Sequence, residues 1–113
     1  MTHHSDALRL RHMREYAREA LEMARGKSRP DLDADRQLNL ALVRLLEIVG
    51  EAAGRVSDET RQRHPEIPWL EITNLRNRLI HGYDDVDFDI LWQILADDLP
   101  PLVVQLNTIV ESL

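Results

Sequence analysis

Residues 38–56 read LNLALVRLLEIVGEAAGRV, and this stretch decides the fold. Its apolar residues recur at intervals of three and four, which is the spacing of one face of an α-helix, and further leucines and valines widen that face. A helix that is apolar on more than one side usually lies at the centre of its domain. Residues 50–54 are glycine-rich and alanine-rich apart from one glutamate, so another backbone can approach closely. We therefore expect a central helix that begins near Asp33 or Asp35.

Another helix precedes the central one. Ser5 or Asp6 suits its N-cap, and apolar residues recur at helical spacing as far as residue 24. Most arginines of this segment lie off the apolar stripe. Gly26 is expected to end the helix, and residues 26–30 read as a connection to the central helix.

A short helical turn and a third helix follow the central one. Ser57 begins the turn, and His64 ends it because the residue before a proline avoids the helical region. The third helix is expected from about Pro68 to His81. Gly82 is placed to end it in the left-handed conformation that glycine adopts without strain.

The fourth helix begins at Asp87, which can act as its N-cap. The Pro100–Pro101 pair should kink or briefly interrupt it, because proline lacks the amide hydrogen that a helix uses. Together these segments predict one all-α domain over residues 1–113. Its expected architecture is an antiparallel bundle of about four helices with a short extra helical turn.

The composition narrows the class of protein. The chain has 113 residues, a formal net charge of −6 and no cysteine, which excludes disulfides and fits a reducing cytoplasm. Neither a signal peptide nor an uncharged membrane-length segment is evident, so a soluble, cytoplasmic protein is expected. The net negative charge argues against coating of nucleic acid, which needs many basic contacts. Residues 79–113 contain seven acids and no lysine or arginine, so any RNA contact would be local.

Chemistry-bearing residues gather in residues 75–83, LRNRLIHGY. Arg76 offers a permanently charged planar group that can hold two phosphate oxygens. His81 titrates near neutral pH and can accept or donate a proton there. If His81 ends a helix, the carbonyl dipoles favour its protonated form and an acid role.

Helix geometry separates the two residues. Five positions correspond to roughly 140° around an ideal helix, so one straight helix does not aim Arg76 and His81 at the same phosphate. Asn77 and His81, four positions apart, would share a face. A working site needs either a bend at the helix end or a second copy across a two-fold axis, and we favour a homodimer.

The chain resembles HEPN-domain toxins of the HepT type, whose partners are minimal nucleotidyltransferase (MNT) antitoxins. Arg76, His81 and Tyr83 match the family pattern of Arg, four residues, His, one residue, Tyr. The similarity extends from about residue 38 to residue 106. It includes Ile48-Val49-Gly50-Glu51-Ala52-Ala53, Ile67-Pro68-Trp69, Val86-Asp87, Trp92 and Asp98-Leu99-Pro100.

The resemblance implies a dimeric HEPN fold and the toxin of a type VII HEPN/MNT toxin–antitoxin system. It implies a metal-independent endoribonuclease without cofactor, with Arg76 and His81 as motif residues and Asn77 as the polar residue after the arginine. The RNA's own 2′-hydroxyl would attack, leaving a cyclic phosphate and a 5′-hydroxyl. Tyr83 would be AMPylated by the antitoxin with ATP, which adds bulk and negative charge beside the cleft and repels substrate. Asp84-Asp85, directly after the tyrosine, departs from many relatives and makes the rim acidic.

Other interpretations remain open. Arg76 could form a surface ion pair with Glu71 or another acid, and His81 could simply bond a carbonyl at a helix end. The chain could be a catalytically silent HEPN subunit that binds a nucleotide or docks a nucleotidyltransferase, or a purely structural helical dimer. The Glu-x-x-His motif of di-iron bundles is missing, so no metal site is expected. Trp69 and Trp92 are expected to pack between helices rather than stack on bases.

Overall fold

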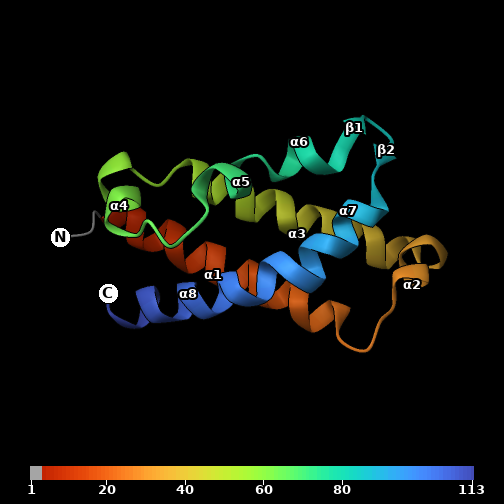
Figure 1. Ribbon diagram of the computed structural model, residues 1–113, viewed down its shortest axis with the longest axis horizontal. Helices are drawn as coiled ribbons and strands as arrows, with labels where there is room; N and C mark the ends of the chain where they lie inside the picture. The colour runs from red at the N-terminus through yellow and green to blue at the C-terminus, as the bar shows by residue number, and fades with distance from the viewer. Residues whose placement is uncertain (1–3) are drawn as a thin grey trace.

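The computed structural model describes residues 4–113, apart from the side chain of His4, and it is mainly helical (Figure 1). Three long stretches run beside one another along the molecule. They are α1 (His4–Ala24), α3 (Arg36–Gly54), and a continuous run made of α7 (Phe88–Gln93), the π-helix η1 (Ile94–Asp98) and α8 (Leu99–Glu111). The shorter elements are α2 (Arg29–Ala34), α4 (Asp58–Arg63), α5 (Trp69–Thr73), α6 (Leu75–Leu79), β1 (Ile80–Gly82) and β2 (Asp85–Val86).

The hydrophobic core lies between the long stretches. α3 packs on α1 and carries α5 and α6 on another side, as expected of a central helix. Fully buried side chains come from each long stretch, including Met13, Leu46 and Leu106. Trp69 and Trp92 are half-buried against this core, which confirms their packing role. The predicted all-α class is confirmed, with one small two-stranded sheet added.

The N-cap of α1 was predicted wrongly. Ser5 and Asp6 both lie inside the helix, which already includes residue 4. The buried Asp6 carboxylate instead accepts hydrogen bonds from Ser57 N at 3.0 Å, from Ser57 Oγ at 2.6 Å and from Thr60 Oγ1 at 2.6 Å. It therefore ties the start of α1 to the start of α4, a partner more than fifty residues away. His3 lies outside the described residues.

The linker between α1 and α3 is shorter than expected. Gly26 ends α1 with a φ of +74°, as predicted. Residues 26–30, however, are not all connection, because α2 begins at Arg29. Arg29 donates to Asp33 within α2 and to Asp89 of α7, so the local pairing and the distant one both stabilise this extra turn. Asp35 then caps α3 by accepting from Leu38 N at 3.0 Å, as predicted.

The single helix expected from Pro68 to His81 is the main error. Asn74 breaks it into α5 and α6, with φ −96° and ψ 9°. α6 then ends at Leu79 because the Leu79 carbonyl accepts from Asp87 N at 2.8 Å. The chain continues as an antiparallel hairpin in which Ile80 pairs with Val86. His81 therefore lies in β1.

Gly82 does not end a helix in the left-handed conformation. It is a strand residue paired with Asp85, and Gly26 is the only glycine with positive φ in residues 4–113. Tyr83 and Asp84 form the short turn between the strands. The hairpin lies beyond α6, well away from the C-terminus (Figure 1).

The predicted irregularity of the last helix lies one turn before the proline pair. Residues 94–98 form a π-helix, and Pro100 and Pro101 occupy the first turn of α8. Proline rings clash with carbonyls one turn earlier, and a π-turn shifts those carbonyls without breaking the helix. None of the helices in residues 4–113 combines the length and the apolar character needed to cross a bilayer.

Candidate active site

Arg76 lies on α6 and faces α3. Its Nε is 3.4 Å from Glu47 Oε2, and the Arg76 side chain stays 64% exposed whereas Glu47 is 20% exposed. Asn77, beside it, donates from Nδ2 to Asn74 Oδ1 at 2.8 Å. Both residues line a depression of about 300 Å³ between α3 and α5–α6, with Glu47, Gly50, Glu51, Gly54 and Thr73. The guanidinium thus has one acid partner and remains open to an anionic ligand.

Gly50 allows α5 to lie directly on α3. A Cβ at this position would be 3.0 Å from the Ile72 carbonyl oxygen, closer than nearly all real contacts. The prediction that a thin stretch of this helix admits another backbone is therefore confirmed at Gly50.

His81 is positioned by Asp87 across the hairpin. His81 Nε2 is 3.7 Å from Asp87 Oδ2, while Asp87 Oδ1 accepts from Asp89 N and Ile90 N and so caps α7. The pKa of Asp87 is lowered, first by the Ile90 amide, then by the Asp89 amide and by His81. Because His81 is in a strand, the helix-dipole argument for its acid role fails. The Asp87 carboxylate instead orients the imidazole through the contact to Nε2.

Tyr83 projects from the hairpin turn and is fully exposed. It lines a second depression of about 470 Å³ between α3 and the hairpin, together with Arg36, Asn39, Leu40, Val43, Arg44, Glu47, Ile80, Asp84, Asp85, Val86 and Phe88. Glu47 lies at the border and lines both depressions. The two depressions therefore adjoin at Glu47 of α3, with Tyr83 lining one and Arg76 lining the other.

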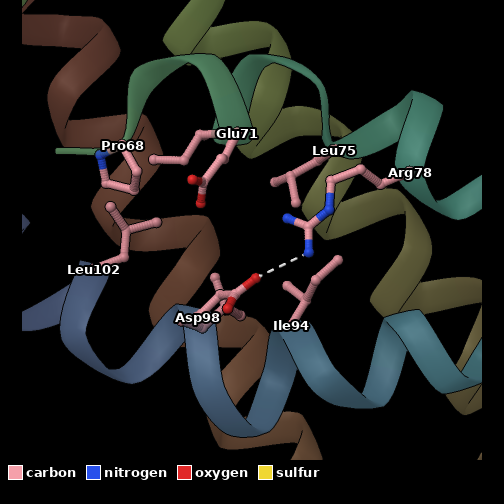
Figure 2. A pocket seen from close by; sticks show the side chains of 9 residues that line it. Pro68, Glu71, Leu75, Arg78, Ile94, Asp98 and Leu102 are labelled. Atoms are coloured by element: carbon pink, nitrogen blue, oxygen red, sulfur yellow. Dashed lines mark hydrogen bonds and ion pairs between the residues drawn. The ribbon is translucent and has the colours of Figure 1, made fainter.

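Arg78 turns away from this surface. It donates from Nη2 to Asp98 Oδ2 at 3.2 Å, beside an apolar cavity of about 20 Å³, room for about one water molecule (Figure 2). Pro68, Leu75, Ile94 and Leu102 also line that cavity. The Arg78–Asp98 contact connects α6 to the π-helix. The cavity beside it is too small for a nucleotide.

A single chain brings some of the expected residues together but not all. Arg76 and Asn77 share one depression, whereas neither depression includes His81, and no hydrogen bond or ion pair within residues 4–113 joins Arg76 to His81. The expected shared face of Asn77 and His81 is wrong, because the helix ends between them. No group of three or more potential metal ligands occurs in the same residues.

Two contact residues were missing from the sequence-based site. Glu47 is the acid partner of Arg76, so the surface ion pair expected with Glu71 or another acid is formed with Glu47. Its signal was available, since it is a lone acid within the apolar run from Leu45 to Val49. Asp87 was recognised as a helix cap but not as the partner of His81.

Comparison with known proteins now identifies the family. The model of the family described as "Ribonuclease HepT-like" matches residues 13–109. The chain belongs to the HepT-like ribonuclease family. A protein of Thermococcus cleftensis named "Probable ribonuclease HepT" is 40% identical over 72 residues, 64% of this chain and 66% of that protein, slightly under two thirds. A protein of Caldanaerobacter subterraneus named "Putative RNase TTE0752" is 35% identical over 103 residues, 91% of this chain and 92% of that protein.

Family membership confirms the resemblance and the enzyme class predicted from the sequence. Similarity to this HepT-like family spans both depressions, since the matched residues contain Arg76, His81, Tyr83 and Glu47. No solved structure was found to match the chain.

Proposed function

We propose that this HepT-like ribonuclease is a metal-independent endoribonuclease in which Arg76 and His81 act on one RNA phosphate. The 2′-hydroxyl oxygen would attack phosphorus while its proton passes to water. The P–O5′ bond breaks, His81 donates a proton to the departing 5′ oxygen, and a 2′,3′-cyclic phosphate remains. Arg76 would offset the negative charge that develops on the phosphoryl oxygens, and Asn77 would donate to one of them.

One observation carries this proposal. The motif's guanidinium and imidazole each have a carboxylate partner, Glu47 for Arg76 and Asp87 for His81, while both side chains remain about half exposed or more. Carboxylates orient these groups, and exposure leaves their remaining donors available to a phosphate.

The proposed active form is a homodimer. Within one chain Arg76 faces α3 and His81 faces the start of α7, so a second copy would supply the missing half of each site. Arg76 of one subunit and His81 of its partner would then hold the same phosphate.

Tyr83 is the proposed control point of a type VII HEPN/MNT toxin–antitoxin pair. Its fully exposed phenol at a two-residue turn is accessible to a nucleotidyltransferase antitoxin. Transfer of AMP from ATP to its oxygen, with release of pyrophosphate, would add a phosphodiester beside Glu47 and the Arg76 depression. The added charge and bulk would repel an incoming RNA phosphate.

The test uses the purified chain and a labelled RNA, with cyclic-phosphate ends scored on the products. Arg76→Ala and His81→Ala should each reduce the cleavage rate by at least about a hundredfold without changing the circular dichroism spectrum. Arg25→Ala, which alters an exposed arginine at the end of α1, is the control and should cleave normally. Cleavage at the wild-type rate by both motif variants would overturn the assignment.

Modification is tested separately. Incubation with the cognate nucleotidyltransferase and labelled ATP should label the wild-type chain but not Tyr83→Phe. Cleavage by the labelled chain should fall to background. RNA binding with no cleavage at any dose, combined with labelling at Tyr83, would instead indicate a silent docking subunit.

A further inference from the structure

The depression beside Tyr83 has features that the catalytic proposal does not use. Its volume of about 470 Å³ falls within the range of roughly 300–1,000 Å³ typical of small-molecule sites. α3 forms one wall and the β1–β2 hairpin forms the other. We refer to it as the α3–hairpin groove.

Two arginines of α3 line the groove with little else to bind. The side chain of Arg36, the first residue of α3, makes no hydrogen bond or ion pair with any residue of the described part of the chain. Arg44 has a single contact, to Glu51 at 3.9 Å, and both side chains are about 60% exposed. Such an exposed ion pair contributes little to the stability of the fold, so the guanidinium groups of Arg36 and Arg44 are both available to an anion. The positive end of the α3 dipole adds to the field at Arg36.

The floor of the groove is apolar. Leu40 and Val43 come from α3, while Ile80 and Val86 come from the paired positions of the hairpin. Leu40 lies between the two arginines in sequence and is 53% exposed. An exposed apolar surface between two cationic groups suits a flat base joined to a phosphate better than it suits a simple anion.

We infer that the α3–hairpin groove is a nucleotide subsite that takes one nucleoside monophosphate unit. Arg36 and Arg44 hold its phosphate, and Leu40 contacts its base. This inference rests on the proposed function, because that unit has two possible sources with the same chemistry. It is either the nucleotide of the RNA strand adjacent to the cleaved phosphate, or the AMP carried by Tyr83.

The acidic side chains of the groove oppose phosphate binding. Substitution of an acid and substitution of an arginine should therefore change the affinity in opposite directions. Asp84, Asp85 and Glu47 line the same groove and reduce its attraction for phosphate. Replacing an acid by its amide should therefore tighten binding, while replacing an arginine should weaken it. A groove that only admits ligands by shape would not respond in opposite directions.

Binding is measured without cleavage, using a fluorescent oligoribonucleotide whose 2′ positions are all O-methylated. For the full chain at low salt, Arg36→Gln with Arg44→Gln should raise the Kd by about tenfold or more. Asp84→Asn should lower it by about twofold to threefold. The matched control is Arg25→Gln, which makes one of the same charge changes outside the groove and should leave the Kd within about twofold.

Competition with free 5′-AMP shows whether the groove accepts AMP as well as the RNA strand. Displacement of the oligonucleotide by AMP, dependent on Arg36 and Arg44, indicates a unit that either source can supply. Binding of the oligonucleotide alone indicates the RNA strand. The inference is overturned if the double arginine variant binds as the wild type does, or if Arg25→Gln weakens binding equally.

Failure of the subsite and failure of the catalytic proposal give different results. A chain that binds the probe through Arg36 and Arg44 but cleaves no RNA contradicts the proposed function and leaves the subsite standing. A chain that cleaves through Arg76 and His81, with a probe affinity indifferent to the groove arginines, overturns the subsite alone.

Discussion

At the residue scale, Glu47 connects the features of the site. It touches the Arg76 guanidinium, it lines the Arg76 depression, and it lines the α3–hairpin groove. A carboxylate in this place has two opposing effects on an RNA phosphate. It fixes the orientation of the guanidinium, and it competes with the phosphate for the same donors.

Glu47→Gln should separate these effects. The amide removes the competing charge, so KM should fall by about twofold to fivefold, while loss of the fixed orientation should lower kcat by about tenfold. Steady-state cleavage kinetics measure both constants. Glu111→Gln makes the same charge change at an exposed position of α8 outside both depressions, and it should change neither constant appreciably. Equal kinetics of Glu47→Gln and the wild type would remove Glu47 from the site.

Asp87 links the pH dependence of stability to the His81 contact. Its pKa is below the ordinary value of 3.8, chiefly because the Ile90 amide bonds its charged form. A lowered pKa in the folded state stabilises the fold above the unfolded value, and that stabilisation disappears as the pH falls through the folded pKa. Asn can still cap a helix but cannot ionise. Thermal unfolding should therefore show Asp87→Asn less stable than the wild type near neutral pH, with the difference shrinking below a pH of about 3.8.

The control for this comparison is Asp84→Asn, an exposed turn carboxylate of the same hairpin. The difference in thermal stability between Asp84→Asn and the wild type should not shrink below a pH of about 3.8 as it does for Asp87→Asn. A gap between Asp87→Asn and the wild type that stays constant from neutral to strongly acidic pH would mean that ionisation of Asp87 does not stabilise the fold.

At the element scale, the packing of α5 on α3 depends on one missing methyl group. Gly50→Ala places a Cβ 3.0 Å from the Ile72 carbonyl, and backbone cannot move aside as a flexible side chain can. We expect a loss of about 1–3 kcal/mol in the free energy of unfolding, measured with urea. Cleavage should also fall, because α5 precedes the helix that carries Arg76.

Gly54 provides the matched control on the same helix. A Cβ there meets nothing within 4 Å, and alanine is a better helix former than glycine. Gly54→Ala should be neutral or stabilising by up to about 1 kcal/mol. If both alanine variants were equally stable, the close approach at Gly50 would have no energetic role.

Elements with local causes were predictable from the sequence, and elements with distant causes were not. The caps at Asp35, Ser57 and Asp87 follow from side chains that bond amides within three residues. The end of α6 depends on the Leu79 carbonyl meeting an amide eight residues later. Helical spacing alone could not reveal this, so His81 was placed on a helix. The motif itself was found because Arg, His and Tyr are close in sequence, whereas Glu47 approaches Arg76 through the tertiary fold.

At the scale of the whole molecule, the proposed homodimer can be tested, because Arg76 and His81 contact different partners within one chain, Glu47 of α3 and Asp87 at the start of α7. If each site combines Arg76 of one subunit with His81 of the other, a heterodimer of Arg76→Ala and His81→Ala chains retains one site with both groups intact. The opposite site carries both substitutions. If each site lies within one chain, every site in that heterodimer is defective.

Co-expression of the two variants with different tags, followed by purification on both tags, isolates this heterodimer. It should recover about half of the wild-type cleavage rate per dimer, since one of two equivalent sites is restored. Each variant prepared alone should stay inactive, which controls for reversion and contaminating nuclease. An inactive heterodimer would place the whole site within one chain, and failure to recover any doubly tagged species would contradict the dimer. Two inactive chains can restore activity only if each site takes residues from both subunits. Recovered cleavage would therefore show that Arg76 of one subunit acts with His81 of the other.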